Sequence, residues 1–349
     1  MSLDSYLRAA PKAELHVHLE GAIEPRTVLA LAARNGIALP TTDEASLRAL
    51  FAYRDFPHFA EIFVMITRCL RTAADYELIT YEYGAAMARQ HCRYAEVTFS
   101  PSTSYILGVP QEVYMAGLTR GRVRVRDDFG VEINWIFNIV RKWNDPTRDV
   151  PLADYATRVA IEGKDDGVVA LGLGGMEVGG PPERFAPWFD QARAAGLRSA
   201  PHAGETVGPA SIWGALRSLG AERIAHGVRA VEDATLVAYL AAHQIPLDVT
   251  PTSNICLGVY PSLAAHPLPR LHAAGIPLTV GSDDPPLFNT TLNDEVALLA
   301  APFGLDVAAI DDILLNGVRH SFLPPERKRA LAAQFVAEFA ALKRKSAGE

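Results

Sequence analysis

The sequence predicts an α/β fold built around a parallel β-sheet, and two observations support this. Eight short runs rich in β-branched and apolar residues are spread through the 349 residues, and longer segments with a helical period separate them. Strand, helix and strand repeated in this order give a parallel sheet. Eight such units fit a closed (β/α)8 barrel, although an open, doubly wound sheet has the same local pattern, and periodicity leaves that choice open.

The expected strands are short and lie at regular intervals along the chain. They are residues 14–19, 94–101, 132–140, 168–175, 198–205, 223–228, 246–254 and 277–285. Helices are expected between them where apolar residues recur at spacings of three and four, most clearly in residues 182–196 and 232–244.

Two further helical regions are expected. Residues 20–93, between the first two strands, form several helices, and an insertion after a strand is expected to lie over the C-terminal mouth of a barrel. The tail, residues 329–349, is expected to be a surface helix that ends in a basic stretch. No linker, repeat or low-complexity segment divides the chain, so residues 1–349 are expected to form one domain.

Composition excludes several classes of protein. The net charge is −7, from 33 basic and 40 acidic residues, and no long basic run offers a site for nucleic acid. The N-terminus has the charges but not the apolar core of a signal peptide, and no window approaches the length of a membrane span. Cys69, Cys92 and Cys256 lie far apart, so neither a disulfide framework nor a thiolate metal site is expected. We expect a cytoplasmic protein whose partner is a small molecule.

The first strand carries the pair His16 and His18. Residues i and i+2 of a strand point to the same side, so the two imidazoles converge on one point. A single strand histidine is usually a satisfied core or surface residue. Two unpaired buried imidazoles are costly, however, which favours a shared metal ion for this pair.

Other polar residues follow later strands, at the end of the barrel that holds active sites. His202 and Glu205 end the fifth expected strand, and His226 ends the sixth. Asp283 and Asp284 follow the eighth. Taken alone, this acidic pair before a proline is typical of a helix N-cap, but the buried strand before it directs both carboxylates to the same mouth.

Three imidazoles and one carboxylate suit a divalent ion of borderline hardness, and they leave a position for water, so zinc is the expected metal. Water on such an ion ionises near neutral pH. His226 and Glu205 are the side chains available to move protons beside it.

Five motifs, in this order and at this spacing, resemble the adenosine deaminase family of the amidohydrolase superfamily. The resemblance runs from about residue 11 to about residue 300, and its motifs are ELHVHLEGAIEP, PHAGE, IAHGV, PTSN and SDDP. It implies a (β/α)8 barrel with one zinc ion per chain, which favours closure of the sheet. It also implies hydrolytic deamination at C6 of a 6-aminopurine.

The resemblance also implies a role for each matching residue. Glu205 donates a proton to purine N1, and His226 orients and deprotonates the attacking water. Asp284 holds that water or bonds to N7, and Gly175 contacts N3 through its backbone, although Gly174 and Gly175 also fit a simple turn. The implied zinc ligands are His16, His18, His202 and Asp283.

The substrate is less sharply defined. Glu20 stands where animal adenosine deaminases have an aspartate that contacts the ribose 5′ hydroxyl, so we expect an altered contact there. The segment GLGGMEVGGPPERF lacks the serine of adenine deaminases, which favours adenosine or a 5′-modified adenosine such as aminodeoxyfutalosine over adenine. Phe56, Phe59 and Phe63 lie at helical spacing and fit either an apolar lid or, as we expect, the core.

Two other functions remain open from the sequence. Another metal hydrolase on the same barrel would need a second metal, and binuclear relatives carry a bridging lysine or glutamate where this chain has Gly174, Gly175 and Met176. The second is a binding protein that keeps the fold but has lost its catalytic activity. Such a protein would not need competent residues at every metal-ligand and proton-transfer position, and this chain has them at all of these positions.

Overall fold

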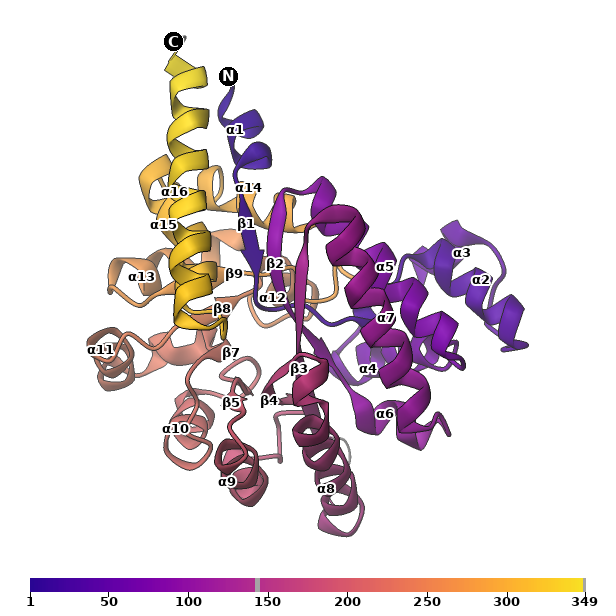
Figure 1. Ribbon diagram of the computed structural model, residues 1–349. Coiled ribbons are helices and arrows are strands. Elements are labelled where there is room, and N and C mark those ends of the chain that lie inside the picture. Colours follow the sequence, from indigo (N-terminus) through magenta and orange to yellow (C-terminus); the bar gives the residue numbers. More distant parts are fainter. Residues whose placement is uncertain (142–144, 348–349) are drawn as a thin grey trace.

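The computed structural model describes residues 1–141 and 145–347, and parallel strands form its centre (Figure 1). One run pairs in the order β1-β2-β3-β4-β5 and a second in the order β6-β7-β8-β9. β5 and β6 are two segments of one strand, interrupted at Ala200 and Pro201, and the Ala200 N–H still donates to the Leu171 carbonyl at 3.1 Å. The strands are β1 (Lys12–Glu14), β2 (Cys92–Phe99), β3 (Glu132–Arg141), β4 (Val168–Gly175), β5 (Arg198–Ser199), β6 (His202–Ala203), β7 (Ile224–His226), β8 (Leu247–Val249) and β9 (Leu278–Val280).

The first and last strands meet and close the barrel. Val17, in the extended chain after β1, forms a parallel bridge with Asp283, which follows β9. The His18 N–H donates to the Asp283 carbonyl at 2.8 Å, and the Asp283 N–H donates to the His16 carbonyl at 3.1 Å. The predicted (β/α)8 barrel is therefore confirmed.

One strand is shorter than the sequence predicts. Residues 246–254 were expected to form a single strand, but β8 ends at Val249 and Pro251 begins the short helix α12 (Pro251–Cys256). Proline has no N–H for a strand ladder, and its fixed φ suits the first turn of a helix. This early turn brings Nδ2 of Asn254, in α12, to 3.4 Å from Nδ1 of His226.

An outer layer of helices covers the barrel, because each presents an apolar face to the strands. In α15, Ile310, Ile313, Leu314 and Val318 are buried on the side that packs on β1 and β9. The helices of this layer are α7 (Gln111–Phe129), α8 (Pro146–Glu162), α9 (Ala186–Ala194), α10 (Pro209–Ser218), α11 (Ala234–Ala242), α13 (Leu268–Ala273), α14 (Leu292–Ala300) and α15 (Val307–Arg319).

The insertion between β1 and β2 divides into two parts. It contains α2 (Pro25–Asn35), α3 (Glu44–Ala49), α4 (Phe56–Thr67) and α5 (Ala73–Arg89). α4 borders the cavity at the mouth, as expected for the insertion, but α5 packs against α7 and β2 on the outer wall (Figure 1). The expectation that residues 20–93 cover the mouth is therefore wrong for α5, which is the helix that connects β1 to β2.

The two ends of the chain lie close together (Figure 1). α1 (Leu3–Ala9) and the long α16 (Pro325–Ala347) contact each other, and Phe335 and Phe339 bury one side of α16. The C-terminal helix was predicted, although residues 348 and 349 of the expected tail lie outside the described residues. No helix within 1–141 and 145–347 has the length and apolar character to cross a membrane.

A buried ionic network lies inside the barrel below the mouth. Arg223 is fully buried and contacts the carboxylates of Glu96 at 2.7 Å and Asp248 at 2.5 Å. Thr279 donates to the other oxygen of Asp248 at 2.6 Å. The main-chain carbonyl of Asp248 lies 2.8 Å from Nδ1 of His16, so the network ends directly beneath the candidate site.

A candidate metal centre and active site

His16 and His18 lie in the chain that follows β1, and both face the carboxylate of Asp283. Nε2 of His16 lies 3.5 Å from Oδ1 of Asp283, and Nε2 of His18 lies 3.2 Å from the same oxygen. The spacing of two residues thus brings both rings to one point, as expected from the sequence. The bond between Nδ1 of His16 and the Asp248 carbonyl requires a proton on Nδ1, so Nε2 is the nitrogen of His16 that is available to a metal ion.

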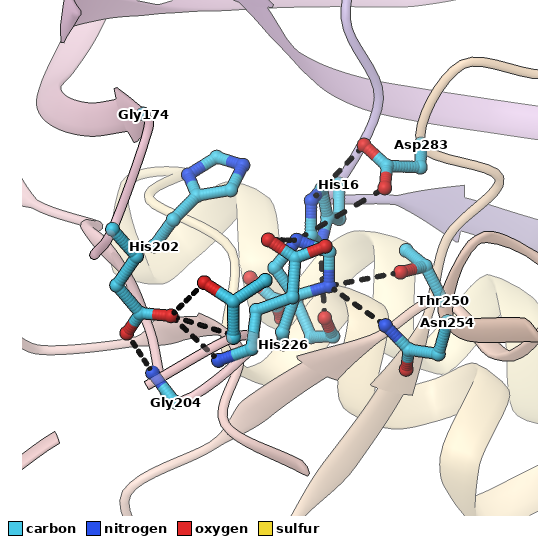
Figure 2. A network of polar contacts seen from close by, with 12 residues as sticks. His16, Gly174, His202, Gly204, His226, Thr250, Asn254 and Asp283 are labelled. Atoms are coloured by element: carbon cyan, nitrogen blue, oxygen red, sulfur yellow. Dashed lines mark hydrogen bonds and ion pairs between the residues drawn. The ribbon is translucent and has the colours of Figure 1, made fainter. Parts of the chain in front are cut away.

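His202, at the start of β6, joins this group. Its Nε2 lies 3.2 Å from Nε2 of His18, and Figure 2 shows its ring on the side of the cluster opposite Asp283. Asp283 adopts a left-handed backbone conformation with φ of 61°, a strained geometry for a residue with a side chain. Residues from the first, fifth and eighth strands of the barrel therefore meet at one place.

These residues offer ligand atoms to a metal ion. Bonds of about 2.0–2.1 Å to zinc place neighbouring ligand atoms roughly 3.4 Å apart, which is close to three separations in this set, 3.2, 3.2 and 3.5 Å. The residues whose ligand atoms all lie within 4.8 Å of one another are His16, His202, His226 and Asp283, while His18 groups with Asp283 and Asp284. Nε2 of His16 is buried and has no hydrogen-bond partner in the described part of the chain. Two imidazole nitrogens in contact also repel each other unless a proton or a cation lies between them.

The protonation states favour a cation as well. Burial and the neighbouring imidazoles hold the pKa of His202 well below its usual value, so this ring is neutral. Burial alone would raise the pKa of Asp283, but His16 and His18 lower it by more than burial raises it. The net pKa is therefore well below the usual value. Burial lowers the pKa of His16, but Asp283 raises it more, and the net pKa is above the usual value. A metal ion would displace the proton shared by His16 and Asp283, because imidazole binds metal in its neutral form.

His226 belongs to the same cluster, since its ligand atom lies within 4.8 Å of those of His16, His202 and Asp283. Its Nε2 is 4.0 Å from Oδ2 of Asp283 and 3.6 Å from Oε2 of Glu205. Figure 2 shows Thr250 and Asn254 on the other side of the ring, where Thr250 Oγ1 and Asn254 Nδ2 lie 3.1 and 3.4 Å from Nδ1. The ring is therefore held in one orientation with Nε2 directed at the cluster.

Glu205 is the buried acid of the site. Burial, followed by the charges of Asp283 and Glu177, raises its pKa to about 8. Its carboxyl group borders the cavity and its nearest ionic neighbour is His226. At neutral pH this carboxyl group carries a proton that it can donate to a bound molecule.

Asp284 also borders the cavity, whereas Glu20 lies behind the wall. Burial, then Asp283 and Glu20, raise the pKa of Asp284 well above its usual value. Glu20 is 1% exposed, and its Oε1 accepts a hydrogen bond from the N–H of Ser100 at 2.9 Å. Glu20 thus supports Ser100, which borders the cavity, and a direct contact between Glu20 and substrate stays a prediction.

The cavity above these residues has a volume of about 690 Å³. Gly175 lies on its wall with φ of 78°, a conformation that favours glycine. The aromatic residues of α4 form the opposite side. Phe59 is buried in the core, as expected, yet it borders the cavity together with the half-buried Phe56 and Phe63. Phe59 therefore belongs to the core, as expected, and all three rings also line the cavity, where a lid over a sugar stays a prediction.

Several residues with a place in the site were not singled out from the sequence. Asn138 on β3 borders the cavity, is 1% exposed, and its Oδ1 has no hydrogen-bond partner among residues 1–141 and 145–347. Asn254 ends the PTSN motif and Thr250 directly precedes it, but the motif itself does not indicate their contact with His226. Glu177 binds the main chain around Glu205. An isolated Asn or Glu in a strand or turn gives no signal of such contacts.

Comparison with known proteins decides the family. The family model described as adenosine deaminase matches residues 11–338. The chain belongs to the adenosine deaminase family. The structure also resembles a solved amidohydrolase from Burkholderia ambifaria with bound zinc, with a TM-score of 0.90 and 27% identity over 100% of this chain and 96% of the other.

Two curated relatives have different stated activities. An aminodeoxyfutalosine deaminase from Streptomyces avermitilis is 40% identical over 95% of this chain and 92% of its own length. An adenine deaminase from Albidiferax ferrireducens is also 40% identical, over 94% of this chain and 93% of its own. Members of this family are metal-dependent hydrolases that remove an amino group, and this chain is such an enzyme.

Proposed function

We propose that the enzyme hydrolyses the 6-amino group of a purine nucleoside and that one zinc ion serves the reaction. The observation that carries the proposal is the meeting of three imidazoles and one carboxylate beside the buried carboxyl group of Glu205. The residues that would hold the ion are His16, His18, His202 and Asp283. We do not propose a second metal, because Gly174 and Gly175 end β4 and Met176 follows it, where a bridging side chain would be needed.

Bound zinc would lower the pKa of a coordinated water, which makes water nucleophilic near neutral pH. His226 would accept the proton that this water loses, because Nε2 faces the cluster. This role requires the tautomer in which Nδ1–H donates to Thr250 Oγ1, so that Nε2 is free to accept. The low pKa of His226, which follows first from burial and then from the charge of His16, keeps its ring neutral and able to take up a proton.

Glu205 would act on the purine ring. As the water oxygen forms a bond to C6, the proton of Glu205 passes to N1, so that negative charge does not build up on the ring. The tetrahedral carbon then carries OH and NH₂. His226 would return its proton to the amino group, which leaves as ammonia, and the C6 hydroxyl would give its proton to the Glu205 carboxylate, which leaves a 6-oxopurine. This role needs a protonated Glu205 at the start, which agrees with its pKa of about 8. A divalent cation in the cluster would lower that pKa, and a substrate that covers the site would raise it.

Asp284 and Gly175 would hold the purine in place. The raised pKa of Asp284, caused first by burial and then by Asp283, favours a neutral carboxyl group that can donate a hydrogen bond to purine N7. Gly175 would approach the N3 edge through its backbone, because it has no side chain to keep a flat ring away.

We further propose that the substrate keeps its sugar. The cavity has a volume of about 690 Å³, which is in the range that holds drug-sized ligands. It extends from the proposed metal ligands to the aromatic residues of α4. Asn138 borders the cavity and its Oδ1 has no hydrogen-bond partner among the described residues, while the ring nitrogens N1, N3 and N7 already have partners in this scheme. A 5′-modified adenosine such as aminodeoxyfutalosine is the substrate we propose, in agreement with the activity of the S. avermitilis relative.

Adenine is the second candidate, because the equally similar A. ferrireducens relative is an adenine deaminase. Steady-state rates on adenosine, deoxyadenosine, thioadenosine, aminodeoxyfutalosine and adenine separate the two, since specificity is a ratio of kcat/KM values. We expect aminodeoxyfutalosine to give the highest kcat/KM. A kcat/KM for adenine above those of all four nucleosides would overturn this substrate assignment and leave the deamination itself in place.

Three broader expectations from the sequence remain proposals. We propose a single domain over residues 1–349, which agrees with one family model that matches residues 11–338. We also propose a cytoplasmic location and a small purine as the partner, with no nucleic acid or membrane involved. The net charge of −7 supports the exclusion of nucleic acid.

A further inference from the structure

The carboxylate of Glu177 is surrounded by the main chain that carries Glu205. Oε1 accepts a hydrogen bond from the N–H of Gly204 at 2.6 Å. Oε2 accepts from three consecutive N–H groups, those of Glu205 at 3.2 Å, Thr206 at 2.7 Å and Val207 at 2.8 Å. The hydroxyl of Thr206 also donates to Oε2 at 3.1 Å. One side chain thus binds every main-chain N–H from residue 204 to residue 207.

This arrangement places a buried charge among main-chain dipoles. Glu177 is 5% exposed, and hydrogen bonds from N–H groups to a carboxylate are stronger than those to a neutral acceptor. Arg141 binds the start of the same segment, since its Nη2 donates to the carbonyl of His202 at 3.2 Å. The segment is therefore held at His202 by a buried guanidinium and at residues 204–207 by a buried carboxylate.

The segment needs this support because it has little regular structure of its own. Gly204 has φ of 72°, β6 ends at Ala203, and the next helix, α10, begins at Pro209. No hydrogen bond to the carboxyl group of Glu205 occurs among the described residues, and its nearest ionic neighbour is His226 at 3.6 Å. The position of the Glu205 side chain thus depends on its main chain.

We infer that Glu177 is a positioning residue, which holds the main chain of residues 204–207 so that the Glu205 carboxyl group reaches the ring of the substrate. Glu177 does not border the cavity, so it would act through Glu205 and not on the substrate. The inference rests on the proposed function for the role of Glu205. The contacts between Glu177 and the main chain do not depend on it.

The variant Glu177→Gln tests the inference, because it keeps the shape of the side chain but turns an NH₂ group toward N–H donors. A displacement of about 1 Å costs on the order of 100-fold in rate. We expect kcat to fall roughly 10- to 100-fold, with KM and zinc content close to those of the wild type. A kcat within about twofold of wild type would overturn the inference.

A double-mutant cycle with Glu205→Gln separates positioning from a general structural role. If Glu177 acts through Glu205, adding Glu177→Gln to Glu205→Gln lowers kcat no further, within about twofold. If the same loss appears in both backgrounds, Glu177 acts by another route and the inference is wrong. Thr206→Val, which removes one hydrogen bond to Glu177, gives a milder variant for the same cycle should Glu177→Gln fold poorly.

Amide hydrogen exchange provides a readout that does not depend on turnover. Glu177→Gln should speed exchange within residues 204–207, because one of the two acceptor oxygens becomes an NH₂ group, and leave exchange around His16 unchanged. Unchanged exchange at residues 204–207 would overturn the inference even if the enzyme proved inactive on every purine. Absence of turnover by the wild type, with the exchange change present, would instead count against the proposed function.

Discussion

The carboxylate of Asp284 lies directly against the α-carbon of Gly21. A Cβ atom at residue 21 would overlap Oδ1 of Asp284, and it would also approach Cβ of Asp284 to 2.7 Å. The chain after the first strand and the chain after the last strand are thus packed together at the cavity. The glycine is required here for close approach, because its missing side chain leaves the space that Asp284 occupies.

Gly21→Ala should therefore displace Asp284 and lower kcat/KM by roughly 100-fold, with the fold retained. Gly36→Ala is the matched control, since Gly36 ends α2 with φ of 65° and a Cβ there meets no atom within 4 Å. The control introduces backbone strain of about 1 kcal/mol without touching the cavity, so its activity should match wild type. Steady-state kinetics and thermal melting of both variants check this. Full activity in Gly21→Ala would show that Asp284 can move without consequence.

Removal of His18 and removal of His226 should have different effects on metal binding. His18→Gln removes a proposed zinc ligand, so zinc affinity should fall by more than about tenfold. His226→Gln leaves the proposed ligands in place, so it should retain one zinc ion per chain and lose about 10²- to 10⁴-fold in kcat. Elemental analysis after equilibration with a zinc buffer measures both. Loss of zinc from His226→Gln but not from His18→Gln would reverse the assignment of the two histidines.

Asn138→Ala should affect nucleosides and not the free base. The variant removes a carboxamide that we place against the sugar, so kcat/KM for adenosine should fall about tenfold, the effect of one lost hydrogen bond to a buried group. Adenine has no sugar, and its kcat/KM should change less than twofold. Equal losses on adenosine and adenine would place Asn138 against the purine instead.

Arg223→Met should destabilise the fold strongly. It leaves Glu96 and Asp248 as buried carboxylates without their guanidinium, and breaking such a network costs about 3–5 kcal/mol. Arg198→Met is the control, since the contact between Arg198 and Glu222 is largely exposed and contributes little. Urea unfolding measures both variants. A free energy of unfolding for Arg223→Met close to that of the control would show that the network adds no stability.

The residues at the strand ends could be predicted because the barrel brings those ends together. His16, His18, His202 and Asp283 are separated by up to 267 residues, yet each follows a recognisable apolar strand. The end of β8 was misplaced because Val249 and Thr250 are typical strand residues and only Pro251 stops the strand.

Supporting residues were not predicted, for a different reason. Glu177 has its role because four N–H groups 27 to 30 residues later converge on it, and no local pattern encodes that meeting. Asn138 gives no sequence signal either, since its importance lies in an unpartnered oxygen on a cavity wall. The size of that cavity depends on how α4 packs, which periodicity does not specify.

Ammonia release measured while zinc is added back to metal-free enzyme tests the central claim most directly. With aminodeoxyfutalosine, adenosine or adenine as substrate, we predict that activity rises in proportion to zinc and reaches its plateau at one ion per chain. Each ammonia released should match one 6-oxopurine formed, followed by the change in ultraviolet absorbance. No ammonia from any of these purines at full zinc occupancy, or a plateau only at two ions per chain, would contradict the proposal of a mononuclear zinc deaminase.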